Sequence, residues 1–237
     1  MPKATHPRTS ASTPPAGALE ETPERLLDAA AAVFVERGFR GATIREICQR
    51  AGANVAAVNY HFKGKQEIYT AVLRRSYQRS IERHDPRGGL PVGAPPRERL
   101  LAFVGSFLRR ILDESDSGHF GRLMSREIVD PTAALNVLAE RDIHPVARIL
   151  EEIVRDVLGP AATVETVRLS VLHIAGQCLF HHHSRPIINR LFPEQTYTAE
   201  DVDAIASHIT DFSLEGLRGL RSRTGPKPPR LPGEGKR

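Results

Sequence analysis

The stretch from Thr43 to Lys65 constrains the fold more than any other part of the sequence, because it encodes two short helices joined by a three-residue turn. The hydroxyl of Thr43 can accept the amide of Glu46, whose carboxylate can reach back, so a helix begins here. Gly52 follows the apolar residues of that helix at a position where a left-handed conformation ends it. Asn54 can then cap the next helix. Two short helices at so tight a turn are typical of a helix-turn-helix unit, whose second helix reads DNA.

The second of these helices, predicted from Val55 to about Tyr60, combines small apolar residues with polar donors. Small residues in its exposed first turn allow close approach to another macromolecule, and the phenol, imidazole and ammonium groups that follow suit phosphate oxygens. We expect base contacts from Asn54, Val55, Ala57 and Asn59, and from Arg45 of the preceding helix. We expect phosphate contacts from Thr43, Tyr60, His61 and Lys65. The structural alternative is that the aromatic residues pack a three-helix core and the lysines are merely solvated.

The charge distribution favours a polyanion partner at this end of the chain. The whole chain has 33 Lys and Arg, 28 Asp and Glu, and a net charge of +5. Residues 23–84 carry eleven bases and six acids, a net charge of +5, whereas residues 85–217 carry thirteen and nineteen, a net charge of −6. Residues 1–22 are balanced, and the tail from Arg218 onward carries +6. Basic charge gathered around the helix-turn-helix is expected of a nucleic-acid-binding domain.

The other apolar patterns also recur at helical spacing, and no alternating run requires a strand. A first helix is predicted from Thr22, with Pro23 at its first position, to Gly38. Later helices are predicted over residues 65–83, 97–114, 117–129, 132–139, 146–158, 163–183 and 199–220, with a loop at residues 85–96 and a break or kink near Pro145. The predicted fold is all-α, with an N-terminal three-helix helix-turn-helix domain and a larger C-terminal helical domain for ligand binding and dimerisation. The predicted boundaries are a disordered segment 1–21, a DNA-binding domain 22–67, a helical domain 68–220 and a disordered basic tail 221–237.

Other classes of protein find little support in the sequence. Nucleophile elbows, phosphate loops and acid pairs do not occur in the context that catalysis requires. There is no apolar run of about eighteen residues and no signal-peptide core, so neither membrane insertion nor secretion is indicated. Cys48 and Cys178 lie in apolar helical patterns and are expected to be buried thiols. We therefore expect a cytoplasmic protein that is no enzyme, binds no metal or cofactor and has no membrane partner.

A histidine cluster at His181–His183, with His173 upstream, offers the alternative of a helical enzyme or metal-binding protein. Neighbouring helical side chains diverge by roughly 100°, and His173 lies about 12 Å along the axis from the start of the cluster, so at most two of these rings can share an ion. No recognised zinc-binding spacing accompanies them.

A polar line along the same helix suggests a ligand site or a subunit contact. Thr166, Ser170, His173, Gln177 and His181 follow helical spacing on an otherwise apolar element. Polar groups buried there require partners, which either a bound ligand or a second subunit can supply. The expected ligand-binding residues are Phe107, Phe120, Met124, Glu127, Ser170, His173 and Gln177, although the apolar ones also suit ordinary core packing.

The helix-turn-helix resembles that of the TetR-type repressors over about residues 22–75. The resemblance rests on Thr43, the Ala51-Gly52 pair and Tyr60-His61-Phe62 before Lys65. The chain departs from the family in having Ala56 in place of the usual Gly, Asn59 in place of Tyr, and Gly64 before the lysine in place of Ser. The string NVAAVNYHF is similar to the CecR-type branch, and so, more weakly, is GQCLF at residues 176–180.

This resemblance implies a DNA-binding regulator that acts as a homodimer. It implies that the last two helices pair with their copies as a four-helix bundle, whereas closing a monomer core is the alternative. The expected interface residues are Val171, Ala175, Leu179, Ile205, Ile209 and Phe212. A ligand-responsive repressor is therefore expected, with a double-stranded, near-palindromic operator and release by a small-molecule effector of unknown identity. A regulator that senses a protein, or nothing, remains the alternative.

Overall fold

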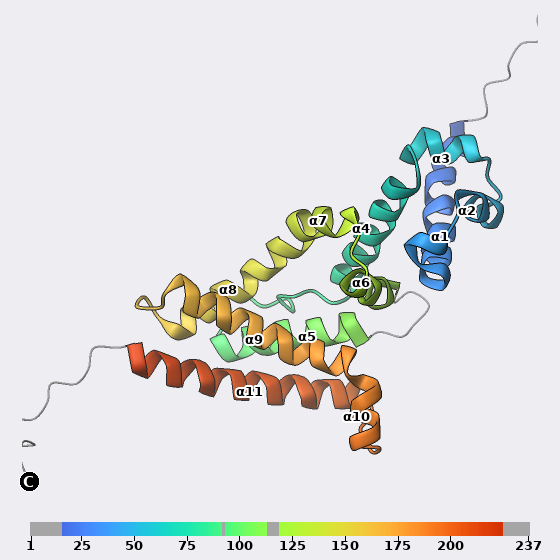
Figure 1. The fold of residues 1–237 in the computed structure, drawn as a ribbon. Coiled ribbons are helices and arrows are strands. Elements are labelled where there is room, and N and C mark those ends of the chain that lie inside the picture. The colour runs from blue at the N-terminus through green and yellow to red at the C-terminus, as the bar shows by residue number, and fades with distance from the viewer. Residues whose placement is uncertain (1–15, 92, 113–118, 225–237) are drawn as a thin grey trace, which may run out of the picture. The chain divides into compact units, whose positions relative to one another are not determined.

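The computed structural model describes residues 16–224 except residue 92 and residues 113–118, and for residues 16–22 it describes the backbone alone. Every regular element within these ranges is helical, which confirms the predicted all-α fold (Figure 1). The chain divides into two compact units, residues 1–72 and residues 73–237. The predicted disorder of residues 1–15 and 225–237 lies outside the described residues.

The first unit contains α1 (Ala16–Gly41), α2 (Ile44–Ala51), α3 (Val55–Phe62) and the start of α4 (Lys65–Arg83). At Gly38, where the first helix was predicted to end, the backbone leaves the helical region with φ 70° and ψ 175°. The predicted start at Thr22 was too late, because the backbone is already helical from Ala16. Alanine, leucine and glutamate precede Pro23 and favour helix, so the proline lies inside α1 rather than at its beginning.

An aromatic cluster joins the helices of the first unit. Phe34 of α1 packs edge-on against Tyr69 of α4, with ring centroids 4.7 Å apart, and Phe39 lies 4.9 Å from the same tyrosine. Phe34 and Tyr69 are fully or almost fully buried, as are Ile47 of α2 and Val58 of α3. Each of the four helices therefore contributes at least one side chain that water does not reach, and this burial fixes the positions of the two short ones.

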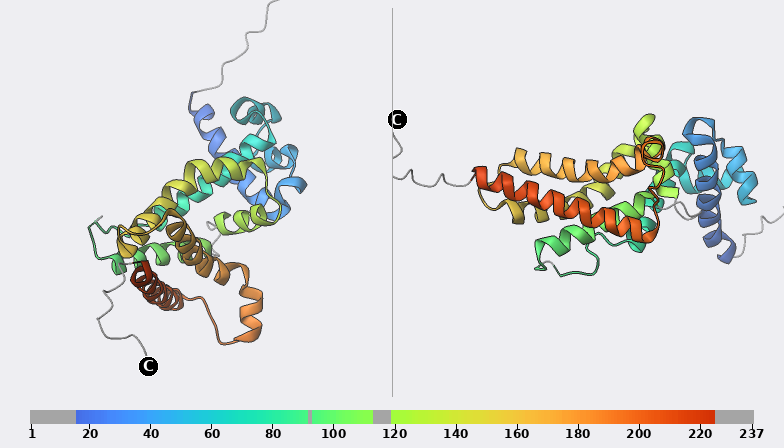
Figure 2. Two further views of the ribbon diagram at one scale, coloured as in Figure 1. Left: turned by 60° about the vertical axis from the view of Figure 1, so that its left-hand side comes forward. Right: turned by 90° about the horizontal axis from the view of Figure 1, so that it is seen from below.

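The second unit contains the remainder of α4 and the helices from α5 onward. These are α5 (Pro96–Leu112), α6 (His119–Val129), α7 (Ala133–Leu138), the π-helical turn η1 (Ala139–Ile143), α8 (His144–Leu158), α9 (Val164–His183), α10 (Arg185–Leu191) and α11 (Ala199–Thr224). Apolar side chains of α5, α8, α9 and α11 share one core. Figure 2 shows α9 and α11 running alongside each other in both views, in agreement with their contacts.

Three details of the second unit differ from the predicted helices. At Pro145, where a break or kink was predicted, the helical course is not broken: the π-helical turn leads directly into α8, and Pro145 lies in the first turn of α8. The short helix α10 was not predicted, although Pro186 marks its first turn in the same way. The last helix continues to Thr224, so residues 221–224, predicted to be disordered, are helical.

Both cysteines are buried free thiols, as predicted. Burial raises the pKa of the Cys178 thiol to about 12, so this side chain stays protonated at neutral pH. Among the described helices, none combines the length with the apolar character that a membrane span requires.

Candidate nucleic-acid interface and ligand cavity

The turn between α2 and α3 has the geometry that its residues predict. The Glu46 amide donates to the Thr43 hydroxyl at 3.2 Å and so starts α2. Gly52 ends α2 in the left-handed conformation, at φ 60° and ψ 36°. The Glu46 carboxylate, expected to reach back to the cap, instead lies 3.5 Å from the Arg37 guanidinium of α1. The first half of the predicted capping box is present, and the carboxylate ties α2 to α1.

Arg25 of α1 fixes this turn, a role that was not predicted from the sequence. Its Nη2 donates to the Ala51 carbonyl at 2.6 Å, satisfying a group at the end of α2. A Cβ atom on residue 52 would lie 3.1 Å from the same nitrogen, so Gly52 is needed for space as well as for its positive φ. Because Arg25 lies in a different helix, no local pattern around the turn indicates its role.

The exposed face of α3 carries small and amide side chains. The Asn54 side chain accepts the Ala56 amide at 3.0 Å and begins the helix. Val58 is fully buried and anchors the opposite face, whereas Val55 remains 41% exposed. Of the predicted base-contacting residues, Asn54, Val55, Asn59 and Arg45 are exposed and Ala57 is half-buried. Ala56, which is not among the predicted base contacts, is more exposed than Ala57. The buried side chain of Val58 determines which side of this short helix faces solvent, and Ala56 lies on that side.

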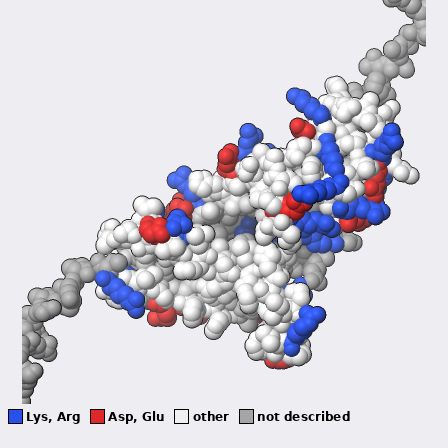
Figure 3. Space-filling model, in the orientation of Figure 1, with Lys and Arg blue, Asp and Glu red and all other residues white. Residues whose placement is uncertain are grey.

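The groups predicted to contact phosphates lie at the two ends of this region. Tyr60 is 80% exposed, and its ring packs edge-on against His61 with centroids 4.9 Å apart. The Lys65 ammonium donates to the Arg40 carbonyl at 3.2 Å and lies 4.8 Å from the centre of the Phe39 ring. Two of its three protons remain for other acceptors. Figure 3 shows several lysine and arginine side chains, with a few acidic ones among them, on the visible surface of the first unit.

Lys63 is a further cation of this surface that the predicted set omits. It ends α3 in the left-handed conformation, with φ 57°, and its side chain is exposed. The sequence places Lys63 among the cationic donors that follow this helix, but because a positive φ is uncommon for a residue with a side chain, it gave no sign that Lys63 ends the helix.

The second unit contains a cavity of about 260 Å³ lined by side chains of α4, α5, α6, α8 and α9 and by Ile143 of η1. Three of the predicted ligand-binding residues, Phe107, Phe120 and Met124, lie on its wall. Most of the remaining wall is aliphatic. Its polar members are Tyr77, Arg110, His182 and His183. The cavity is therefore suited to a mainly apolar molecule.

Glu127, also predicted to bind ligand, has a structural role instead. Its side chain is 1% exposed, and its carboxylate accepts the amide of Thr132 at 3.0 Å and the hydroxyl at 3.1 Å. Thr132 caps α7 through that hydroxyl, which accepts the Ala134 amide. The carboxylate therefore closes the turn between α6 and α7 and is not part of the cavity wall.

The two sets of residues predicted on α9 line two different hollows in the structure. Val171, Ala175 and Leu179, expected at a subunit interface, line the cavity. Ser170, His173 and Gln177, expected in the ligand site, line a separate hollow between α9 and α11. Periodicity shows that a helix has two faces, but the neighbours of each face come from the tertiary fold, so the sequence left this assignment open.

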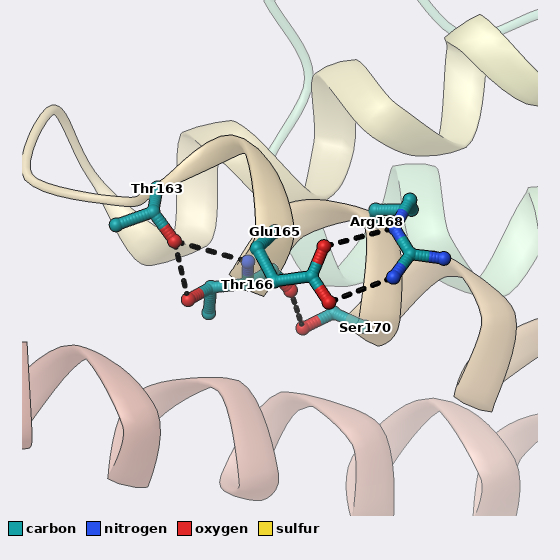
Figure 4. Close-up of polar contacts among 5 residues, drawn as sticks. All are labelled: Thr163, Glu165, Thr166, Arg168 and Ser170. Carbon is teal, nitrogen blue, oxygen red and sulfur yellow. Dashed lines mark hydrogen bonds and ion pairs between the residues drawn. The ribbon is translucent and has the colours of Figure 1, made fainter.

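The polar line on α9 is satisfied largely within the chain. The Ser170 hydroxyl donates to the Thr166 carbonyl at 2.8 Å, and Thr163 caps the helix (Figure 4). The Gln177 amide donates to the Ser213 hydroxyl of α11 at 3.2 Å. Neither Ser170 nor Gln177 therefore requires a bound ligand to compensate for its burial.

Large apolar side chains are exposed along α9, α10 and α11. They are Val164, Leu169, Leu172, Phe180, Ile187, Leu191, Phe212 and Leu220. Of the predicted interface residues on α11, Phe212 is 67% exposed, Ile205 is half-buried and Ile209 is buried in the core. Exposed apolar side chains that gather into one patch are typical of a protein-protein interface.

The histidine cluster is divided among separate partners. His182 shares a hydrogen bond of 2.8 Å with the Ser125 hydroxyl, His183 contacts the Leu179 carbonyl at 3.1 Å, and His181 lies 3.5 Å from the Tyr197 hydroxyl. Within the described ranges, no group of three or more histidine, cysteine or acidic side chains is arranged to hold a metal ion.

Comparison with protein families gives two matches that together cover most of the described chain. Residues 26–72 match the model for bacterial regulatory proteins of the tetR family. Residues 96–217 match the model for the C-terminal domain of the HTH-type transcriptional dual regulator CecR.

Individual relatives are also transcriptional regulators by name. The chain is 27% identical over 213 residues to the HTH-type transcriptional dual regulator CecR of Shigella flexneri, covering 84% of this chain and 93% of that one. It is 34% identical over 119 residues to the HTH-type transcriptional activator FasR of Mycolicibacterium smegmatis, covering 50% and 52%. A solved transcriptional regulator from Pseudomonas aeruginosa PAO1 has a similar fold, with a TM-score of 0.64, 20% identity and coverage of 87% and 95%.

Proposed function

Because the chain belongs to the CecR-like branch of the TetR family of DNA-binding transcriptional regulators, which are not enzymes, we propose that it is a homodimeric repressor released from its operator by a small molecule. The observation that carries the proposal is the exposed face of α3. It presents small residues and amides beside exposed basic side chains, next to a turn fixed by Gly52 and Arg25. Such a helix can approach the base edges of a major groove closely.

The dimer would place two copies of α3 in successive major grooves, about 34–36 Å apart, on a near-palindromic site. Asn54 and Asn59 can hydrogen-bond to base edges, while Val55 and Ala56 favour contact with thymine methyl groups. Because few long side chains are available on this face, DNA shape contributes more to specificity than in an arginine-rich reader.

Release would follow from binding in the cavity of the second unit. Tyr77 of the cavity wall lies on α4, whose first residue is Lys65, shortly after the end of α3. A ligand that favours a different position of α4 would shift the population away from the DNA-binding state by its differential affinity for the two states. No separate signalling element is required.

Selection of bound sequences from random DNA, using the full chain, tests the proposal directly. We expect an inverted repeat with half-sites separated by about one helical turn. A reporter placed behind the selected site should be silenced by the protein in cells. Enrichment of a single half-site would contradict dimeric recognition, and activation of the reporter would contradict repression.

The proposed dimer predicts a large effect at Phe212. Truncation of this exposed ring by Phe212→Ala should weaken dimerisation about tenfold or more, because buried aromatic side chains dominate interface energies. Sedimentation at decreasing protein concentration measures the change. Val129→Ala, at another exposed apolar position, at the end of α6, is the matched control and should leave the dissociation constant unaltered. Equal behaviour of the two variants would place the interface elsewhere.

Lys65 provides a test of the phosphate contacts. Lys65→Ala should weaken binding to all DNA sequences and reduce the slope of log affinity against log salt by about one, because one phosphate contact is lost. A small loss of stability should accompany it, since the Arg40 carbonyl loses a donor. Arg168→Ala, an exposed cation of α9 paired with Glu165, serves as control. If Lys65→Ala keeps the wild-type salt slope, its ammonium does not contact phosphate.

A further inference from the structure

Arg110 stands apart from the other side chains around the cavity. It lines a wall that otherwise consists mostly of aliphatic and aromatic residues, and it is the one arginine, lysine or acidic residue among the described lining residues. Its side chain belongs to α5 and the residue is 4% exposed. A guanidinium has five N–H donors and remains charged in proteins, so its burial creates a strong demand for acceptors.

The contacts of this guanidinium within the described residues are with neutral groups. Its Nε donates to the Ser106 carbonyl of the same helix at 3.3 Å. It faces the Tyr77 hydroxyl and lies 5.4 Å from the centre of the Phe107 ring. Burial lowers the pKa of Arg110, as expected for a cation removed from water, while the hydroxyl of Tyr77 acts in the opposite direction.

The two buried carboxylates among the described residues of this unit are engaged elsewhere. Asp142 is held by Arg74, at 2.6 and 3.1 Å, and by Gln78 at 3.3 Å. Glu127 closes the turn at Thr132. A buried cation without a nearby anion is destabilising, and a ligand that brings an anion into the cavity would remove that cost.

We propose that the cavity binds an amphiphilic monocarboxylate, whose carboxylate pairs with Arg110 beside the Tyr77 hydroxyl and whose apolar body packs against the aliphatic and aromatic wall. Planar carboxylates match the fork of a guanidinium with two parallel hydrogen bonds. This proposal rests on the proposed function, in which the cavity is the effector site, and it assigns the chemical class of the effector.

The volume of the cavity limits the apolar body. A cavity of about 150 Å³ holds a benzene ring, so one of about 260 Å³ accommodates roughly ten carbon atoms. A naphthalene ring system satisfies this limit. The pair 2-naphthoate and 2-naphthamide then separates charge from shape, because the two molecules are almost isosteric and only the first is an anion.

Calorimetric titration of the full chain, without DNA, with these two compounds tests the proposal. We expect 2-naphthoate to bind roughly 10- to 100-fold more tightly than 2-naphthamide, in line with hydrogen bonds to a charged partner. Arg110→Gln should abolish this preference by weakening the acid alone. Arg109→Gln, at the neighbouring exposed residue paired with Asp203, should keep the preference intact.

Each outcome decides the question. If the acid and the amide bind equally, or neither binds, the assignment of a carboxylate ligand is overturned, and the same holds if Arg110→Gln retains the wild-type preference. Should Arg110→Gln fail to fold, the comparison of the two compounds on the wild-type chain still gives the answer. Because these measurements contain no DNA, their failure leaves the operator selection standing, and failure of that selection leaves the ligand result standing.

Discussion

Replacing Ala56 by glutamate should abolish operator binding at physiological salt. Ala56 lies on the exposed face of α3 and its amide is already used by the Asn54 cap, so a longer side chain can project outward without disturbing the turn. A carboxylate on that face meets the phosphates and the negative potential of the groove. Like-charge juxtaposition in an interface costs several kcal/mol, so we expect affinity to fall by about 100-fold or more. Fluorescence anisotropy with a labelled operator measures the loss.

A matched variant separates this effect from a general change in charge. Ala133→Glu introduces the same residue at another exposed alanine, in the first turn of α7, where a carboxylate suits the helix dipole. It should retain wild-type affinity, and both variants should keep the wild-type helical circular dichroism spectrum and melting temperature. If Ala56→Glu binds the operator normally, α3 does not enter the groove by its exposed face.

Local signals in the sequence were sufficient for the DNA-binding unit. The hydroxyl of Thr43, the positive φ of Gly52 and the side-chain cap of Asn54 each depend on residues within three positions, so their pattern specifies the geometry directly. Arg25 was missed because its bond to Ala51 spans 26 residues. Such a contact depends on how α1 packs on α2, which no local pattern encodes.

In the second unit, too, contacts between helices far apart in the sequence could not be predicted from local patterns. Phe107 and Phe120 were predicted to lie on a cavity wall, and both line the cavity. On α9, the residues expected at the subunit interface line the cavity, and Ser170 satisfies its hydroxyl on its own helix. Arg110 was absent from the predicted set for a related reason. An arginine within an apolar helix has no periodic signature, and its burial becomes visible only when α4, α6 and α9 surround it.

Asp142 should be the most sensitive charged residue of the second unit. It lies in the π-helical turn, its side chain is 6% exposed, and it binds two residues of α4, Arg74 and Gln78. Asp142→Ala leaves the guanidinium and the amide without their acceptor. Removal of one member of a buried pair costs about 3–5 kcal/mol, and because the Arg74 side chain is 30% exposed, we expect a loss of about 2–3 kcal/mol in the free energy of unfolding. Urea denaturation measures it.

Asp211→Ala is the control, because Asp211 forms an equally close pair with Arg97 but both side chains are about half exposed. Its loss should destabilise the protein much less than the loss of Asp142, because the exposed pair is screened by water. A double variant of Arg74 and Asp142 should be less destabilised than the sum of the single variants, since each one alone leaves an uncompensated partner.

Tyr77 lies on α4 between Arg74 and Gln78, so the carboxylate of Asp142 also positions the part of the helix that contributes to the cavity wall. Equal losses at Asp142 and Asp211 would show that burial of the carboxylate contributes nothing, and would remove the π-helical turn from any role in holding α4.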